Sequence, residues 1–326
     1  MSHPSRPAVV ARDLVKTYPA GRGAAPVRAL DGLSLEITAG TVVAMLGRNG
    51  AGKSTTVKIL TTLARPDSGT ATVAGHDVAG EAEAVRRAVG LVGQKPASDP
   101  LATGRENLVL AGRIQGLGKA AARQRAADLL DRFALTDAAD RLAKTYSGGM
   151  ARKLDVAIGL VARPAVLFLD EPTTGLDPEA RAQLWNEIER LTTDEQTTVL
   201  LTTHYLDEAD RLADRVAIVD GGRVVVEGTP DSLKSELRGD AVQVELAVAS
   251  SAALPALALV PGLRDAVLDG TRLRARAESG ARAVPAVLAA LDDAGVAVAS
   301  VTVARPSLDD VYLRHVGHAF HPEVAA

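Results

Sequence analysis

The 326-residue sequence contains no cysteine, which excludes disulfides, thiolate metal ligands and cysteine nucleophiles and is typical of a reducing compartment. Aromatic residues make up only 2% of it, so the core must be built mainly from Ala, Val and Leu. The sequence has no run of about 20 apolar residues, so any role at a membrane is expected to require a partner. The net charge of −3 offers no global positive field for nucleic acid or an anionic membrane surface.

The N-terminal residues lack the cationic, apolar and small-residue sections of a secretion signal, and Ser2 stands where myristoylation requires glycine. We therefore expect a cytoplasmic protein. Hydrophobic residues make up 47% and charged residues 24%, which is ordinary globular usage and excludes collagen-like and wholly disordered chains. The length suffices for one large domain or two smaller ones.

Strand and helix patterns alternate along the first two thirds of the chain. Two apolar, β-branched runs within residues 8–37 predict antiparallel strands, and residues 69–80 predict another hairpin. Short apolar runs at 41–46, 165–169 and 197–203 predict strands that are buried on both faces. Helical periodicity between these runs favours an α/β fold with a parallel, doubly wound core sheet and an antiparallel β subdomain.

Residues 96–164 are rich in Ala, Leu and Arg at helical spacing and predict a helical subdomain. A following helix is expected to end at Gly239, where we place a domain boundary. The remaining sequence predicts the order strand, helix, strand, strand, helix, strand, helix, which is a small α/β domain. The expected domains are therefore 1–239 and 240–326.

A glycine-rich segment between the first buried strand and its helix has the pattern G-x-x-x-x-G-K-[ST]. Glycines let successive backbone N–H groups turn toward one anion without obstruction by side chains. Lys53 can reach the β- and γ-phosphates of a nucleotide, Ser54 can ligate Mg²⁺, and the helix dipole adds to the attraction. The predicted nucleotide-binding residues of this phosphate loop are Gly47, Arg48, Asn49, Gly50, Ala51, Gly52, Lys53, Ser54 and Thr55.

Polar residues follow the other two predicted buried strands. Asp170 and Glu171 come directly after 165–169, and burying both carboxylates requires a compensating cation such as Mg²⁺. We assign Asp170 to the metal and Glu171 to the attacking water as general base. His204 follows 197–203 and is expected at the same sheet edge, because open α/β sheets bind ligands at the carboxyl ends of their strands. There it can contact the γ-phosphate.

Together with other motifs, these residues resemble the ATP-binding cassette (ABC) ATPases over about residues 7–235. Gln94 in LVGQKP is similar to the Q-loop of that family, which implies a contact with Mg²⁺ and a part in catalysis beside Glu171 and His204. Tyr18 stands where the family stacks an aromatic side chain on adenine. Stacking of this kind contributes about 1–3 kcal/mol in nucleic-acid complexes.

The segment YSGGM at 146–150 resembles the signature of the same family. Ser147, Gly148 and Gly149 precede a helix and so create a second helix N-terminus suited to an anion. The resemblance implies that these residues, with Asp177 of the GLD segment, bind ATP held by the phosphate loop of a second copy, so that a homodimer encloses two ATP molecules. Four residues are expected to form the apolar stripe of this helix: Met150, Leu154, Ile158 and Val161.

Three further segments resemble the daunorubicin-resistance type of multidrug exporter ATPase: TGRENL at 103–108, YSGGMARKLD at 146–155 and PSLDDVYL at 306–313. This resemblance implies an ATP-hydrolysing subunit, peripheral on the inner face of the cell membrane. Such a subunit drives export of a hydrophobic drug or antibiotic through a separate membrane permease. The resemblance also implies that residues 240–326 help two ATPases to pair, although this domain could instead pack only on its own cassette.

Other functions fit the sequence less well. Export of a lipid, glycan or peptide stays open, as does import, because the permease selects the transported compound. A nucleic-acid-associated cassette ATPase is disfavoured by the single cassette, the absence of sustained heptads and the acidic balance of charge. Glu171 and His204 disfavour a binding module that does not hydrolyse ATP.

Overall fold

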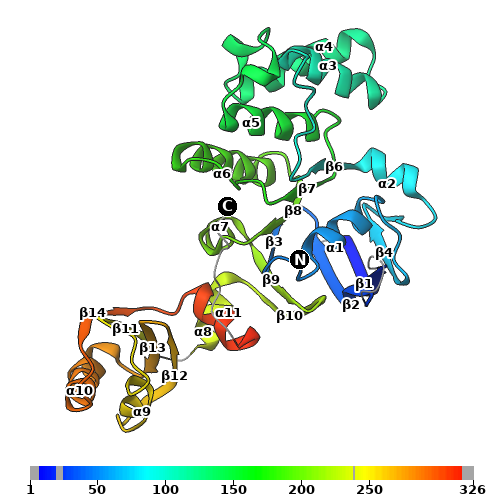
Figure 1. Cartoon of the computed structure of the whole chain (residues 1–326). Helices are drawn as coiled ribbons and strands as arrows, with labels where there is room; N and C mark the ends of the chain where they lie inside the picture. Colours follow the sequence, from blue (N-terminus) through cyan, green and yellow to red (C-terminus); the bar gives the residue numbers. More distant parts are fainter. Residues whose placement is uncertain (1–6, 20–24, 238, 318–326) are drawn as a thin grey trace, which may run out of the picture. The chain divides into compact units, whose positions relative to one another are not determined.

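The computed structural model describes residues 7–19, 25–237 and 239–317, which belong to two compact units divided between Thr229 and Pro230 (Figure 1). The first unit contains two β-sheets and the helices α1–α7. The second unit contains a third sheet and the helices α8–α11.

A four-stranded antiparallel sheet begins the first unit. Its order is β2-β1-β4-β5, and the long strands β1 and β2 pair along most of their length, which confirms the predicted hairpin. Alternate residues of β1 and β2 are buried against the interior. The strand bounds are β1 Pro7–Tyr18, β2 Val27–Thr38, β4 Ser68–Val73 and β5 His76–Asp77.

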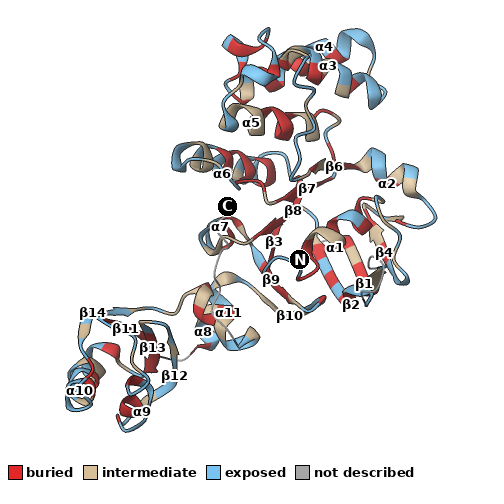
Figure 2. Cartoon of the chain, in the orientation of Figure 1, coloured by how far each residue is buried: buried red, intermediate tan, exposed pale blue. Residues whose placement is uncertain are grey.

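The central sheet of the first unit has six strands in the order β10-β9-β3-β8-β7-β6. All neighbouring pairs are parallel except β9 with β10, so the predicted parallel core is confirmed. Every residue of β3, β7 and β8 is buried, which is the reason why their sequences do not alternate between apolar and charged residues (Figure 2). The bounds are β3 Val42–Leu46, β6 Val89–Val92, β7 Val166–Asp170, β8 Thr198–Thr203, β9 Arg215–Asp220 and β10 Arg223–Gly228.

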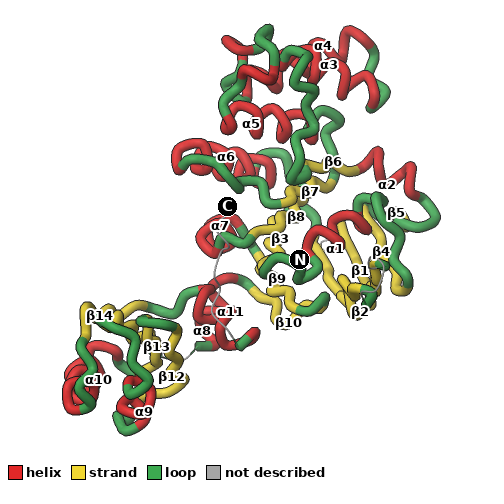
Figure 3. The backbone as a smooth tube through the Cα atoms, viewed as in Figure 1, coloured by secondary structure: helices red, strands yellow, loops and turns green. Residues whose placement is uncertain are grey.

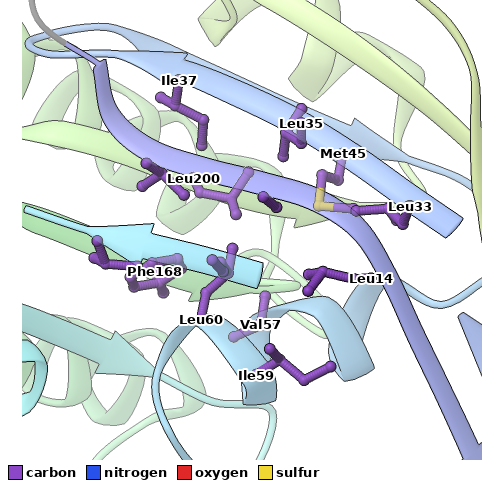
Figure 4. Close-up of a cluster of buried hydrophobic side chains, with 14 of the residues drawn as sticks. Leu14, Leu33, Leu35, Ile37, Met45, Val57, Ile59, Leu60, Phe168 and Leu200 are labelled. Carbon is purple, nitrogen blue, oxygen red and sulfur yellow. The ribbon is translucent and has the colours of Figure 1, made fainter. Parts of the chain in front are cut away.

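One hydrophobic core joins these two sheets through helix α1. Side chains of α1, including Val57, Ile59 and Leu60, gather with those of both sheets (Figure 4). Burial of each large aliphatic side chain contributes about 1.5–3 kcal/mol, so this cluster fixes the phosphate loop between β3 and α1. The helix bounds in the first unit are α1 Lys53–Leu60, α2 Ala82–Ala88, α3 Gly104–Ile114, α4 Lys119–Arg132, α5 Gly148–Gly159, α6 Pro178–Thr193 and α7 Leu206–Leu212.

Helices α3, α4 and α5 form the predicted helical subdomain, in which α5 contacts strand β6 of the central sheet (Figure 3). Helix α5 begins at the signature and buries Leu154, Val156 and Ala157. It ends at Gly159, so Val161, expected as the last residue of the apolar stripe, lies beyond the helix, although it is still buried.

The second unit has the order β11, α9, β12, β13, α10, β14 and α11, as predicted from the sequence. Its sheet has the order β12-β13-β11-β14 with all neighbours antiparallel, so it is a split β-α-β arrangement without parallel pairs. The apolar face of this sheet forms a core with α9 and α10. The bounds are β11 Asp240–Leu246, α9 Ala253–Ala258, β12 Leu263–Asp269, β13 Arg272–Ala277, α10 Gly280–Asp293, β14 Val298–Ala304 and α11 Leu308–Val316.

Helix α11 lies over the polar face of the same sheet, where alternate residues of β13 are arginines. Arg274 pairs with Asp309, and Arg276 pairs with Asp310 at 3.2 Å. Helix α8 (Pro230–Glu236) contacts α11 and buries Leu233. These contacts place α8 in the second unit, so the division falls before this helix, whereas the sequence predicted a boundary after it.

Candidate functional site

The phosphate loop is held tightly between neighbouring strands. A Cβ atom on Gly47 would lie 2.4 Å from the carbonyl oxygen of Val219, at the end of β9. Gly52 has a φ of +112°, and a Cβ atom there would lie 2.7 Å from the carbonyl oxygen of Ala29. Both positions therefore require glycine, and they bring the loop backbone against the sheet directly before α1.

Lys53, the first residue of α1, lies inside the loop with only 4% of its surface exposed. Its Nζ donates to the carbonyl oxygens of Gly47 at 2.5 Å and Arg48 at 3.1 Å, and it lies 3.9 Å from Glu171 Oε1. Burial lowers the pKa of Lys53, while the nearby carboxylates of Glu171 and Asp170 oppose this shift. The loop thus contains a cation beside the predicted catalytic carboxylate.

Asp170, at the end of β7, is buried and accepts two hydroxyl hydrogen bonds. Ser54 Oγ donates to Asp170 Oδ1 at 3.2 Å, and Thr202 Oγ1 donates to the same oxygen at 2.5 Å. Across the described part of the chain, no group of three His, Cys, Asp or Glu side chains could hold a metal by itself. A carboxylate and a hydroxyl do fit Mg²⁺, which commonly takes one or two protein ligands and completes its shell with phosphate and water oxygens.

Glu171 has a φ of +51°, a left-handed conformation that is unusual for a residue with a side chain. Its amide donates to the carbonyl oxygen and the hydroxyl of Thr202, at 3.0 and 3.1 Å. This backbone brings Glu171 Oε2 to 3.3 Å from His204 Nδ1. This contact with His204 lowers the pKa of Glu171, with burial opposing, so the carboxylate stays ionised and able to accept a proton.

A cavity of about 420 Å³ lies over the phosphate loop. Gln94 and Glu171 line it beside the loop, and Val27 lines it from β2. Tyr18 pairs with Val27 in the register of β1 and β2, so it lies next to this cavity, where its stacking on adenine stays a prediction. The loop residues that line the cavity are Arg48, Asn49, Gly50, Gly52, Lys53, Ser54 and Thr55, whereas Ala51 packs in the core.

Gln94 and Glu171 also line a second cavity of about 350 Å³, together with Gly148 and Arg152 of α5 and Gly175. Its walls therefore come from the predicted Q-loop, the signature helix, the catalytic strand end and the GLD segment. The site of ATP chemistry and the helical subdomain meet at these residues.

The signature residues lie at the start of α5. Ser147 caps this helix by accepting a hydrogen bond from the amide of Met150 at 3.3 Å. Tyr146 donates to the carbonyl oxygen of Ala138 at 2.7 Å, which anchors the signature to the helical subdomain. Asp177 likewise caps α6, accepting from the amide of Ala180 at 2.8 Å. Several predicted nucleotide contacts are absent from the described lining of the cavity over the phosphate loop: Tyr18, Gly47, Ala51, Ser147, Gly148, Gly149 and Asp177.

Two residues near the site were not predicted as functional. Thr202 joins Asp170 and Glu171, as described above, and only the parallel register of β7 with β8 reveals it. Glu208, on α7 just after His204, has no exposed surface and accepts a hydrogen bond from Trp185 Nε1 at 3.0 Å. Burial raises the pKa of Glu208, with hydrogen bonds opposing the shift.

A buried lysine in a glycine loop between a strand and a helix, with a hydroxyl-bonded aspartate at the end of a parallel strand of the same sheet, defines the P-loop nucleoside-triphosphatases. Residues 30–174 match the family described as "ABC transporter". Residues 228–316 match the family described as "ATP-binding protein DrrA1-3-like, C-terminal domain".

Relatives match nearly the whole chain. The daunorubicin/doxorubicin resistance ATP-binding protein DrrA of Streptomyces peucetius is 49% identical over 322 residues, which cover 97% of this chain and 94% of the relative. The doxorubicin resistance ATP-binding protein DrrA of Mycobacterium tuberculosis is 43% identical over 312 residues, covering 94% and 92%. The chain therefore belongs to the DrrA-type ATP-binding proteins of the ABC transporter family, and it is an ATP-hydrolysing transport subunit.

Solved structures agree with the cassette. The ATP-binding cassette MJ0796, in a dimeric post-hydrolysis state bound to ADP and Pi, superposes with a TM-score of 0.63 and 26% identity over 68% of this chain and 98% of that chain. Within the described ranges, none of the helices has the length and apolar character needed to cross a bilayer.

Proposed function

We propose that this subunit forms a homodimer around two MgATP at the cytoplasmic face of the membrane and drives export of a hydrophobic drug or antibiotic through a separate permease. The observation that supports this most directly is the contact of Glu171 with both His204 at 3.3 Å and Lys53 at 3.9 Å, beside the cavity over the phosphate loop. A base, a polar group for the terminal phosphate and a phosphate-binding cation are thus gathered at one point.

The side chains divide the chemistry among themselves. Glu171, whose pKa is lowered by the neighbouring His204, orients the attacking water and accepts its proton. Lys53 exchanges its bonds to loop carbonyls for phosphate oxygens, and loop amides hold the same anion. Asp170, Ser54 and Gln94 would hold Mg²⁺, which would neutralise the charge that develops on the phosphates.

The proposed dimer follows from the position of the signature. The N-terminus of α5 is suited to an anion, yet the described lining of the phosphate-loop cavity includes none of Ser147, Gly148 or Gly149. A second copy, placed head to tail, brings its signature and Asp177 to that cavity. The related cassette MJ0796 was solved as a dimer, which supports the pairing of two copies.

The proposed cargo is based on the relatives. Proteins named for daunorubicin or doxorubicin resistance match this chain over 89–97% of its length, including the C-terminal unit. The Nod factor export ATP-binding protein I of Burkholderia orbicola is also 43% identical, but over only 66% of this chain. Drug export is therefore the first candidate, and export of a lipid, glycan or peptide is the second.

Glu171→Gln tests the ATPase cycle. The amide cannot accept a proton, so we expect turnover to fall by about 10²–10⁴-fold while MgATP traps a dimer that size-exclusion chromatography with light scattering detects. Glu179→Gln, on the exposed first turn of α6, is the matched control and should behave like wild type. Normal turnover of Glu171→Gln, or a chain that stays monomeric with MgATP, would contradict the proposal.

Export is tested separately from hydrolysis. The tagged Glu171→Gln chain is trapped with MgATP on native membranes, and the integral protein that copurifies is identified by mass spectrometry. Cells that express this protein with the wild-type chain should accumulate less daunorubicin than cells that express it with Glu171→Gln. Equal accumulation would exclude daunorubicin as cargo, and copurification of RNA instead of a membrane protein would overturn the transport function.

A further inference from the structure

Arg152, on the second turn of the signature helix α5, donates to backbone carbonyls on two other segments. Its Nε donates to the carbonyl oxygen of Pro172 at 2.7 Å, and its Nη1 donates to that of Gly93 at 2.7 Å. Its Nη2 reaches the carbonyl oxygens of Asp170 at 3.3 Å and Glu171 at 3.2 Å. One guanidinium thus uses all three of its nitrogens on backbone oxygens.

These carbonyls belong to the hydrolytic centre. Asp170, Glu171 and Pro172 are the segment that carries the metal-binding and water-activating carboxylates, and Gly93 directly precedes Gln94. Arg152 also lines the cavity of about 350 Å³ between Gln94 and Glu171. Its side chain therefore extends from α5 along the wall of this cavity to the backbone beside Gln94 and Glu171.

The backbone that Arg152 binds is held in an uncommon conformation. Glu171 has a φ of +51°, and such residues persist only where their surroundings fix them. The carbonyl oxygen of Glu171 accepts from Arg152 and from the amide of Thr174, while its amide is bound by Thr202. Of the two donors to the Glu171 carbonyl oxygen, the Thr174 amide belongs to the backbone and Arg152 Nη2 to a side chain. Arg152 makes this contact from the helical subdomain.

We propose that Arg152 is a positioning residue that holds the backbone of Glu171, and with it the carboxylate, in the geometry needed for hydrolysis. It acts on the Glu171 of its own chain, although the signature at the start of its helix serves, under the proposed function, the ATP held by the second copy. A planar fork of donors suits several carbonyls at fixed angles, and a lysine ammonium does not reproduce it.

Arg125 provides a matched control. It is also half-buried, and it donates to the carbonyl oxygens of Leu160 and Val161 just beyond the opposite end of α5. Its substitution removes the same kind of buried contact from the same subdomain, away from the carboxylates. Loss of activity that came only from a weakened helical subdomain would therefore be equal for the two arginines.

The first experiment compares Arg152→Lys and Arg152→Met with Arg125→Lys and Arg125→Met in the full chain. We expect both Arg152 variants to lower kcat by about 10²-fold, as a small displacement of a catalytic group does, with little change in the Kd for a fluorescent ATP analogue. Both Arg125 variants should keep kcat, even where thermal unfolding shows an equal loss of stability. Unchanged kcat in the Arg152 variants, or an equal fall in the Arg125 variants, would overturn the proposal.

The second experiment uses mixed dimers purified through two different tags, in which only one protomer keeps Glu171 and the other carries Glu171→Gln. Arg152→Met in the protomer with Glu171 should abolish most turnover, whereas in the other protomer it should have little effect. An effect that is larger in the Glu171→Gln protomer, or equal in both, would show that Arg152 serves α5 and its signature instead. Failure of the wild-type chain to dimerise with MgATP would count against the proposed function, while the first experiment would still decide the role of Arg152.

Discussion

Thr202→Val tests how the strand end holds the catalytic carboxylates. The Thr202 hydroxyl is buried, donates to Asp170 Oδ1 at 2.5 Å and accepts from the Glu171 amide at 3.1 Å. Valine has nearly the same shape but no hydroxyl, so both hydrogen bonds are lost and no large cavity forms. Asp170 keeps its bond from Ser54, and the Glu171 amide keeps its bond to the carbonyl oxygen of Thr202.

The bond to the carboxylate dominates the cost, because a hydrogen bond to a charged group contributes about 1.5–3 kcal/mol. We expect the free energy of unfolding to fall by about 2–3 kcal/mol, which lowers Tm by roughly 4–12 °C for a unit of this size. Because Ser54 alone then holds the Asp170 carboxylate, that carboxylate is less precisely positioned, and we also expect kcat to fall at least about tenfold. Differential scanning calorimetry and steady-state ATP hydrolysis measure the two effects.

Thr198→Val is the matched control in the same strand. Its hydroxyl is buried and accepts one hydrogen bond, from the Gly40 amide at 3.0 Å, at the end of β8 away from the site. We expect a loss of about 1 kcal/mol and an unchanged kcat. Equal stability losses in the two variants, together with normal hydrolysis by Thr202→Val, would refute the reasoning.

Two further predictions concern buried charges. Burial raises the folded-state pKa of Glu208 above its ordinary value of 4.5, so the wild-type free energy of unfolding should decrease as pH rises from about 4.5 toward that raised pKa. The side chain of Glu208→Gln does not titrate, so the Tm of the variant minus the Tm of the wild type should increase as pH rises over this range. A difference that stays constant with pH would contradict the raised pKa of Glu208. Arg276→Met leaves Asp310 buried without its partner and should destabilise the C-terminal unit by about 3–5 kcal/mol. Arg272→Met removes an exposed pair with Glu245 and should lower the free energy of unfolding by less than about 1 kcal/mol. Amide hydrogen exchange measures the difference, and exchange in β13 should become faster in the Arg276 variant only.

The phosphate loop was predictable because its chemistry lies in contiguous residues between a strand and a helix. Asp170, Glu171 and His204 were predictable as a group because each follows an apolar run, and parallel strands bring such ends to one edge. The structure confirms this juxtaposition through the 3.3 Å contact of Glu171 with His204. The nucleotide-contacting roles of the signature and of Tyr18 stay predictions, because they depend on a second chain and on bound ATP.

Other residues of the site could not be found from sequence. Thr202 is one of several threonines in 197–203, and only its register opposite Asp170 distinguishes it. Arg152 binds backbone carbonyls, which carry no side-chain pattern to recognise. The sequence around Glu208 predicts a solvent-exposed helix residue, because no pattern in the neighbouring residues indicates that Trp185 of α6 packs against it. The antiparallel pairing order of the second unit is likewise set by long-range contacts.

The scarcity of aromatic residues gives this chain a built-in optical probe. Trp185 is its single tryptophan, and its indole N–H binds Glu208 on the helix that follows His204. The guanidinium of Arg211 lies 5.1 Å from the centre of the indole ring. Intrinsic fluorescence excited at the indole band therefore arises from one known position beside the strand end of His204, so stopped-flow mixing with nucleotide can follow that junction in unlabelled protein.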